Sequence, residues 1–143
     1  MPQTNFFTGL APATLEQMLD AREQRAALQR RLLNQYKRPL VSFTLNIAGE
    51  YKAFPLAQKT FNEGLSHLTR QLERAGYKVL HRQKKACVTG YECCIAADAQ
   101  AANLKPLLMA IEDSHPLGRL FDMDVLDQDG TILRGEAYGR GQR

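Results

Sequence analysis

The feature that most constrains this chain is a short apolar stretch near its C-terminus that contains two carboxylates. In "LFDMDVL", residues 120–126, large apolar side chains recur at every second position, and Asp122 and Asp124 fill the positions between them. Because side chains alternate across a strand, this pattern predicts a β-strand with one apolar face and both carboxylates on the other face, roughly 7 Å apart at Cβ. Two like charges this close repel each other unless a cation lies between them. The stretch therefore predicts either a cation-binding strand or an exposed edge strand, where charges discourage aggregation.

The rest of the chain predicts one α+β domain over residues 1–143. Its 44% hydrophobic content suffices for a single core, and no composition break indicates a second domain. Apolar residues at three- and four-residue steps predict a first helix from Thr14, where Gln17 completes a capping box. The elements expected next are a strand within 39–52, a helix over 61–75, and a hairpin of 77–81 and 87–97 around the basic turn 82–85. After the hairpin we expect a helix capped by Asn103 that runs to about Asp113, the strand 118–126 with the two aspartates, the turn 127–130 and a returning strand over 131–136.

After the N-terminal helix, this order is β-α-β-β-α-β with an extra C-terminal strand, which is the order of a ferredoxin-like antiparallel sheet. In that topology the first and fourth strands are antiparallel neighbours. The end of the first strand then meets the start of the fourth. We therefore expect one edge of the sheet to gather Asn46, Gly49, Lys52, Arg119, Asp122 and Asp124.

Asp-x-Asp on a strand is the pattern of nucleotidyl-transfer sites. Two Mg²⁺ ions about 3.5–4 Å apart can share such carboxylates and leave coordination positions open for phosphates. The preceding "HPLGR" adds His115, the Gly118 backbone and the Arg119 guanidinium beside the acids. Metals held there would align a hydroxyl with a phosphorus atom and stabilise charge on a pyrophosphate leaving group.

Charge and composition exclude several other classes. The formal net charge is +4, yet residues 112–129 hold six acids against Arg119 alone, whereas 21–38 hold six basic groups against Glu23. This asymmetry indicates cations at one place and an anionic ligand or partner around it. No apolar run approaches the roughly 18 residues that span a bilayer, and the N-terminus lacks the pattern of an export signal. Three cysteines without zinc-site spacing fit a reduced, cytoplasmic protein.

The first predicted helix carries polar residues within or beside its apolar stripe. Arg22, Arg25 and Gln29 stand where a plain core helix would have leucine. One interpretation is that their long stems cover apolar surface while the polar ends reach water. The other is that they face a ligand.

Four blocks of sequence point to a known family: "SHPLGRLFDMDVL", "LVSFTLNIAGEYK", "AREQRAALQ" and "TGYE". Together they resemble the apo-citrate lyase phosphoribosyl-dephospho-CoA transferase family, also called holo-citrate lyase synthase, from about residue 14 to residue 134. The resemblance implies a nucleotidyltransferase with Mg²⁺ or Mn²⁺ as cofactor. It would transfer the 2′-(5″-phosphoribosyl)-3′-dephospho-CoA group from its triphosphate precursor, triphosphoribosyl-dephospho-CoA, to a serine of the citrate lyase acyl carrier protein, the gamma subunit. Pyrophosphate would be released.

The resemblance also implies roles for individual residues. Asp122 and Asp124 would hold the metal, and His115 would position phosphate or assist proton transfer. A second set would bind substrate and its phosphates: Arg119, Lys52, Asn46, Gly49, Gly118, Arg22, Arg25 and Gln29. Glu92 or Glu112 would supply a third carboxylate. Relatives usually continue into a Cys-rich tail that this sequence lacks, which leaves any role of that tail open.

Two other functions remain compatible with the sequence. One is a non-catalytic assembly factor that binds the acyl carrier protein. The other is a ferredoxin-like RNA-binding module, against which the missing interleaved aromatic residues argue. We therefore expect a transferase with no nucleic-acid or membrane partner.

Overall fold

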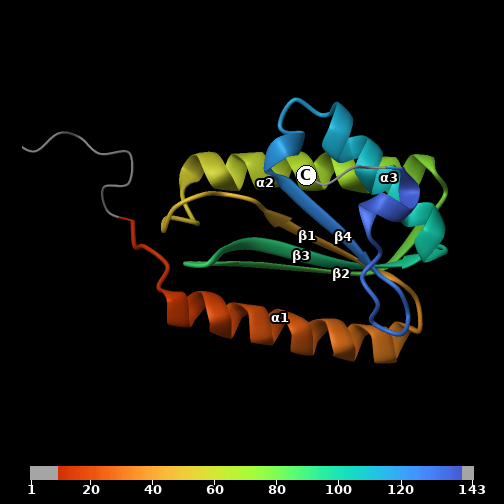
Figure 1. Ribbon diagram of the computed structural model, residues 1–143, viewed down its shortest axis with the longest axis horizontal. Helices are drawn as coiled ribbons and strands as arrows, with labels where there is room; N and C mark the ends of the chain where they lie inside the picture. The colour runs from red at the N-terminus through yellow and green to blue at the C-terminus, as the bar shows by residue number, and fades with distance from the viewer. Residues whose placement is uncertain (1–9, 140–143) are drawn as a thin grey trace, which may run out of the picture.

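The computed structural model describes residues 10–139, and within that range it is an α+β structure with one four-stranded antiparallel sheet between two layers of helices (Figure 1). Helix α1 (Leu15–Tyr36) covers one face, and helices α2 (Pro55–Arg74) and α3 (Ala101–Ser114) cover the other. The strand order is β2-β3-β1-β4. The strands are β1 (Leu40–Leu45), β2 (Lys78–Cys87), β3 (Gly90–Asp98) and β4 (Phe121–Leu126), and short 3-10 helices occupy η1 (Gly118–Leu120) and η2 (Gly135–Tyr138).

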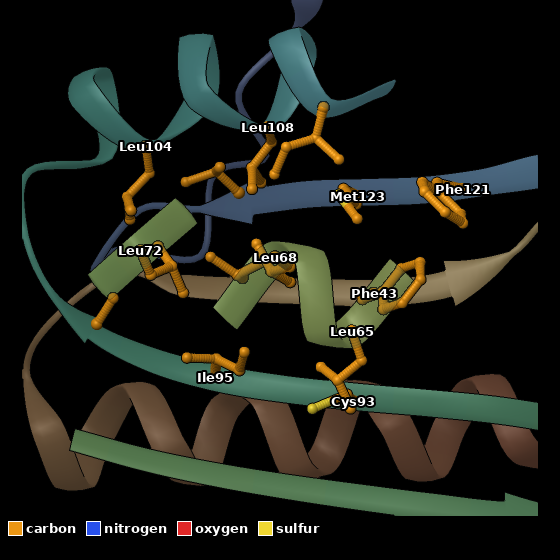
Figure 2. Packing of buried hydrophobic residues seen from close by; sticks show 14 of the residues in the cluster. Phe43, Leu65, Leu68, Leu72, Cys93, Ile95, Leu104, Leu108, Phe121 and Met123 are labelled. Carbon is orange, nitrogen blue, oxygen red and sulfur yellow. The ribbon is translucent and has the colours of Figure 1, made fainter. Parts of the chain in front are cut away.

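Alternation along the strands builds two cores of unequal size. On the α2/α3 face, Phe43, Ile95 and Met123 pack against leucines of both helices, as Figure 2 shows. On the α1 face, a smaller cluster joins Leu32 and Leu33 to Leu40, Cys94, Ala96 and Leu126. Each fully buried large apolar side chain contributes about 1.5–3 kcal/mol. The larger core therefore carries most of the hydrophobic stabilisation and leaves part of the α1 face for polar residues.

Helix α1 begins as the sequence predicts. The Thr14 Oγ1 accepts a hydrogen bond from the Gln17 N–H at 3.0 Å, and the Gln17 Oε1 accepts one from the Thr14 N–H at 2.9 Å. Such a box satisfies amides that have no partner inside the helix. The helix ends at Tyr36, and the next residue, Lys37, caps it in a left-handed conformation with φ 54°.

The predicted neighbourhood of the first and fourth strands is confirmed. After α1 the elements follow in the order β-α-β-β-α-β, and β1 pairs antiparallel with β4. In this register Thr44 lies opposite Asp122, and Ser42 lies opposite Asp124. Both aspartates therefore lie on the α1 face, because Met123 between them belongs to the core of the opposite face.

The predicted basic turn over residues 82–85 is wrong. Those residues lie inside β2, with Arg82 opposite Ile95 and Lys85 opposite Glu92. The strand β2 is an edge of the sheet, and charged side chains are typical of edges because they discourage further pairing. The hairpin turns later, before Gly90, whose φ of +113° favours glycine.

The predicted C-terminal strand is also wrong. The turn at 127–130 forms, with the Gly130 N–H donating to the Asp127 carbonyl oxygen at 2.8 Å, but only one isolated bridge, between Leu126 and Ile132, follows it. The Leu133 N–H still donates to the Val125 carbonyl oxygen at 3.0 Å, and pairing ends after it because the chain then crosses to α3, where η2 makes its contacts.

The boundaries of α3 and β4 differ from the predicted ones. Helix α3 begins at Ala101 with Gln100 as its cap residue, so Asn103 is not the cap and Pro106 lies inside the helix. The buried Ala101 packs into the larger core, and the helix begins three residues earlier than predicted. Residues 118–120 form η1 rather than the start of the strand. No helix within residues 10–139 is long and apolar enough to cross a bilayer.

The contact between α2 and the sheet predicts a stability effect at Gly64. A Cβ there would lie 2.6 Å from Phe43 Cζ and 2.8 Å from Phe121 Cε1, and the Phe43 ring is itself stacked on Phe61 with centroids 4.7 Å apart. We expect Gly64→Ala to lower the free energy of unfolding, because overpacking costs about 1–3 kcal/mol and exceeds the helix-propensity gain of about 1 kcal/mol. Urea unfolding measures this.

The matched control is Ser66→Ala, which changes an exposed position of the same helix. It should leave the urea midpoint unchanged or raise it slightly. A Gly64→Ala midpoint equal to that of Ser66→Ala would show that the aromatic packing is loose.

Candidate active site

A row of polar side chains crosses the α1 face of the sheet. Glu92 on β3 and Asp122 on β4 both lie opposite Thr44 of β1. Neighbouring strands are about 4.7–4.9 Å apart, so the two carboxylates flank Thr44 at roughly twice that spacing. In the next row Ser42 separates Cys94 from Asp124.

Helix α1 contacts these rows with two polar side chains from its middle turns, Arg25 and Gln29. The Arg25 guanidinium forms an ion pair with Glu92, with Nη1 to Oε2 at 3.0 Å. One helical turn further, the Gln29 Nε2 donates to the Ser42 Oγ at 3.2 Å. Arg25 and Gln29 thus have buried polar partners on the sheet, and the smaller apolar cluster lies toward the C-terminal end of α1.

A hollow of about 230 Å³, which we call the α1 hollow, opens between α1 and the sheet. Arg22, Arg25 and Lys52 contribute cations to its lining, and Glu92 and Asp122 contribute carboxylates. The Lys52 Nζ donates to the Ile47 carbonyl oxygen, which holds the lysine over the loop after β1. This mixture of guanidinium, ammonium and carboxylate groups suits an anionic ligand with a bound cation.

A second hollow of about 220 Å³, the α3 hollow, lies on the other side of Asp122. Asp122 and Asp124 line it from β4, Lys105 and Glu112 from α3, and Arg134 from the segment after the turn. Asp122 therefore lines both hollows, and Asp124 lines only the second.

The environment of Asp124 disfavours its charged form. Burial raises the pKa of Asp124 above its usual range, and the negative charges of Asp122 and Glu112 raise it further, whereas Lys105 and Arg25 act in the opposite direction. Burial and like charges prevail, so this carboxylate is held in place at a cost in free energy. A cation bound next to Asp124 would reduce this free-energy cost.

Helix α3 supplies two charged residues to this side of the sheet. Lys105 and Glu112 are only 5% and 6% exposed, and the Glu112 Oε2 accepts a hydrogen bond from the Met123 N–H at 3.0 Å. The sequence resemblance pointed to Glu112, but Lys105 was missed. The sequence does place Lys105 on the same face of α3 as Glu112, because Lys105, Met109 and Glu112 follow one another at four- and three-residue steps.

The structure brings several of the predicted site residues together. Arg22, Arg25, Lys52 and Asp122 line one hollow, Asp124 lies beside it, and Glu92 joins them through its ion pair with Arg25. Gln29 contacts Ser42 in the row of Asp124. These residues come from α1, the loop after β1, β3 and β4.

Other predicted residues do not join them. His115 lies on the α2/α3 face, where its Nε2 is 3.5 Å from Glu63 Oε1 and its ring is 5.0 Å from that of Phe121. The exposed Arg119 in η1 and Gly49 in the loop line neither hollow.

Two further predicted residues have clear backbone roles. The Asn46 N–H donates to the Leu120 carbonyl oxygen at 2.8 Å, which continues the contact between the ends of β1 and η1. Gly118 packs against the end of α3, where a Cβ would lie 1.9 Å from the Glu112 carbonyl oxygen. Only glycine fits there, so Gly118 fixes the approach of β4 to α3 whatever else it does.

Within residues 10–139, no group of three or more His, Cys, Asp or Glu side chains lies close enough to hold a metal ion alone. Asp122 and Asp124 are a pair of carboxylates on one face of a strand. Mg²⁺ is commonly bound through one or two carboxylates, with substrate phosphates and water as the remaining ligands. The pair therefore fits a metal that arrives together with a phosphate ligand.

Cations and paired carboxylates that converge on one face of an α+β sheet define a protein suited to phosphate chemistry, and comparisons with known proteins agree. The profile of the apo-citrate lyase phosphoribosyl-dephospho-CoA transferase family matches residues 13–143, and this chain belongs to that family. The chain is 37% identical over 120 residues to a protein of that name from Citrobacter koseri, an alignment that covers 84% of this chain and 66% of the relative.

Two further relatives give the same result. A probable apo-citrate lyase phosphoribosyl-dephospho-CoA transferase from Vibrio cholerae is 36% identical over 84% of this chain and 68% of its own length. An apo-citrate lyase phosphoribosyl-dephospho-CoA transferase from Escherichia coli is 33% identical over 87% of this chain and 68% of its own length. The chain thus spans about two thirds of the length of these relatives.

The electrostatics of Asp124 predict a stability effect in the absence of divalent ions. Because its pKa is raised, ionised Asp124 destabilises the folded form at neutral pH, and a neutral side chain of the same shape removes that cost. We expect Asp124→Asn to melt at or above the wild-type temperature in buffer with chelator, measured by circular dichroism.

Asp129→Asn is the matched control. The Asp129 Oδ1 accepts a hydrogen bond from the Thr131 N–H at 2.9 Å, and hydrogen bonding to Thr131 lowers the pKa of Asp129. Its variant should melt no higher than wild type. An Asp124→Asn protein that melts well below wild type would mean that Asp124 is a structural ion-pair partner.

Proposed function

We propose that this protein transfers the 2′-(5″-phosphoribosyl)-3′-dephospho-CoA group from its triphosphate precursor to a serine of the citrate lyase acyl carrier protein and releases pyrophosphate. Support comes from the names of the relatives, which state a phosphoribosyl-dephospho-CoA transferase that acts on apo-citrate lyase. The observation that carries the proposal to particular residues is that Asp122 lies between two hollows, one lined by three cations.

The triphosphate would bind in the α1 hollow. Arg22 and Lys52 offer positive charge there, and Arg25 is fixed by its ion pair with Glu92. An arginine held by a carboxylate is pre-oriented, so less conformational entropy is lost when it binds phosphate. We propose Arg22, Arg25 and Lys52 as the phosphate-binding residues of this enzyme.

Asp122 and Asp124 would hold Mg²⁺ or Mn²⁺. When bound, such a metal supplies charge stabilisation for the phosphoryl group and its leaving pyrophosphate. Glu112 accepts the Met123 amide between the two aspartates and so fixes the strand from which they project. We therefore propose Asp122 and Asp124 as the metal ligands and Glu112 as the residue that positions their strand.

The transfer forms a bond between the serine oxygen and phosphorus and breaks the bond between phosphorus and the pyrophosphate oxygen, while the hydroxyl loses its proton. The attacking and leaving oxygens lie roughly in line in such reactions. The triphosphate would extend from the α1 hollow past Asp122, which lines both hollows, into the α3 hollow, and the serine would approach the phosphorus atom beside Asp122. The reaction is then of the nucleotidyltransferase class.

For the fold we propose the ferredoxin-like class, with Asp-x-Asp on its fourth strand as in nucleotidyltransferases. Support comes from the order β2-β3-β1-β4, in which the first strand is central and the fourth is at an edge. The RNA-binding alternative is less favoured, because α1 packs on the sheet face that such modules use to stack bases.

The direct test is to incubate the protein with citrate lyase acyl carrier protein, triphosphoribosyl-dephospho-CoA and Mg²⁺, and to measure the mass of the carrier. We expect the mass to rise by the prosthetic group with wild type, and the rate to fall by about 100-fold or more with Asp122→Asn, because electrostatic stabilisation of a transition state is typically that large.

Asp129→Asn in the exposed turn is the control and should transfer at the wild-type rate. If Asp122→Asn keeps full activity while His115→Gln loses it, the reacting centre lies on the α2/α3 face and our assignment is wrong. If wild type binds the carrier without modifying it, the protein is a carrier-binding assembly factor.

A further inference from the structure

Lys105 is a buried cation without a close partner in the part of the chain that the structure describes. It is 5% exposed, yet within residues 10–139 it forms no hydrogen bond and no ion pair under 4 Å. Its electrostatic partner is Asp124, and both residues line the α3 hollow. The Lys105 side chain is thus largely enclosed by the protein and lines the α3 hollow beside Asp124, although lysine is mostly an exposed residue.

We propose that Lys105 makes the binding of a divalent cation at Asp122 and Asp124 depend on a polyphosphate in the same hollow. The inference rests on the proposed function, because it takes the two aspartates as the metal ligands. It adds a role for a residue on α3 that neither the sequence motif nor the phosphate-binding set contains.

The charges of the hollow lead to this coupling. Without ligands, the Lys105 ammonium partly neutralises Asp124. A divalent cation at the two aspartates adds positive charge close to that ammonium, and the lysine side chain that carries it is largely enclosed by the protein. Repulsion between the cation and Lys105 therefore weakens binding of the metal alone.

A polyphosphate would turn this repulsion between the metal and Lys105 into a favourable interaction. Its oxygens can coordinate the metal and accept hydrogen bonds from the ammonium, so that Lys105 changes from a repelling neighbour into a ligand-binding group. Metal and polyphosphate should then each raise the affinity for the other by the same factor. The site would stay empty of metal until the phosphate substrate arrives.

The test measures Mn²⁺ affinity by electron paramagnetic resonance, with and without inorganic triphosphate. The complex of Mn²⁺ with triphosphate in protein-free solution is measured separately and subtracted. For wild type we expect triphosphate to raise Mn²⁺ affinity at least about tenfold, within the range that coupled sites commonly show. For Lys105→Met we expect tighter binding of Mn²⁺ alone and a coupling factor at least about threefold smaller.

Lys59→Met is the matched control, because Lys59 is an exposed lysine of α2. It should keep both wild-type values. Lys105→Gln is a second variant for the case in which Lys105→Met does not fold, and thermal melting of each variant monitors folding. The affinity for Mn²⁺ alone separates two roles of Lys105, because loss of a repelling charge tightens this binding and loss of a structural support weakens it.

Three outcomes overturn the inference. These are a wild type without coupling, a Lys105→Met protein with wild-type coupling, and a Lys105→Met protein that binds Mn²⁺ alone more weakly than wild type. The last would mean that Lys105 holds Asp124 in position. None of them decides the proposed transfer, which the mass of the carrier tests separately.

Discussion

The antiparallel pairing of β1 with β4 is the constraint on which the rest of the site depends. It sets Thr44 opposite Asp122 and Ser42 opposite Asp124, and it places Met123 in the larger core. A slip of one residue would turn both aspartates into that core and Met123 toward α1, because side chains alternate with period two. Burial of Phe121 and Met123 on one face thus fixes the carboxylates on the other. Gly118 and the Asn46 amide fix the end of the strand where the aspartates begin.

The two helical layers contribute different side chains to the surroundings of β4. Helix α1 contacts the polar rows of the sheet through Arg25 and Gln29. Its residues Leu32 and Leu33 pack in the smaller core. Helix α3 packs its leucines into the larger core. Its residues Lys105 and Glu112 line the α3 hollow together with Asp122 and Asp124 of the edge strand β4. The edge position of β4 makes this possible, since an inner strand would have a neighbour where the α3 hollow lies. The charges that disfavour ionised Asp124 in the protein alone are the same charges that favour a cation with phosphate.

Local sequence patterns predicted much of this architecture. The capping box at Thr14 and the neighbourhood of β1 and β4 are confirmed, because caps and strand alternation follow from nearby residues. The basic stretch 82–85 was misread as a turn because charged residues mark both turns and edge strands, and only the position in the sheet separates them. The predicted terminal strand is reduced to one bridge with β4, because the chain turns toward α3 after Leu133, and this turn depends on tertiary contacts that local patterns do not show.

The site was predictable in part. The alternation of Asp122 and Asp124 placed them on one face without any family knowledge. The interpretation that Arg25 faces a ligand stays a prediction, and the structure shows its ion pair with Glu92. His115 stands close to the aspartates in sequence but on the other face of the sheet, which sequence proximity cannot reveal. Lys105 was missed because a lysine on a helix usually faces water, and its burial follows from how α3 packs at the sheet edge.

The central claim is that the reacting centre lies on the α1 face at Asp122. It is tested most directly by backbone amide NMR spectra of the protein with substoichiometric Mn²⁺ and inorganic triphosphate, because the paramagnetic ion broadens nearby resonances. The account predicts that the amides of Thr44, Asp122 and Asp124 broaden first, while those of Glu63 and His67 on α2 stay sharp. Broadening centred on Glu63, His67 and His115, with sharp signals from β4, would contradict it.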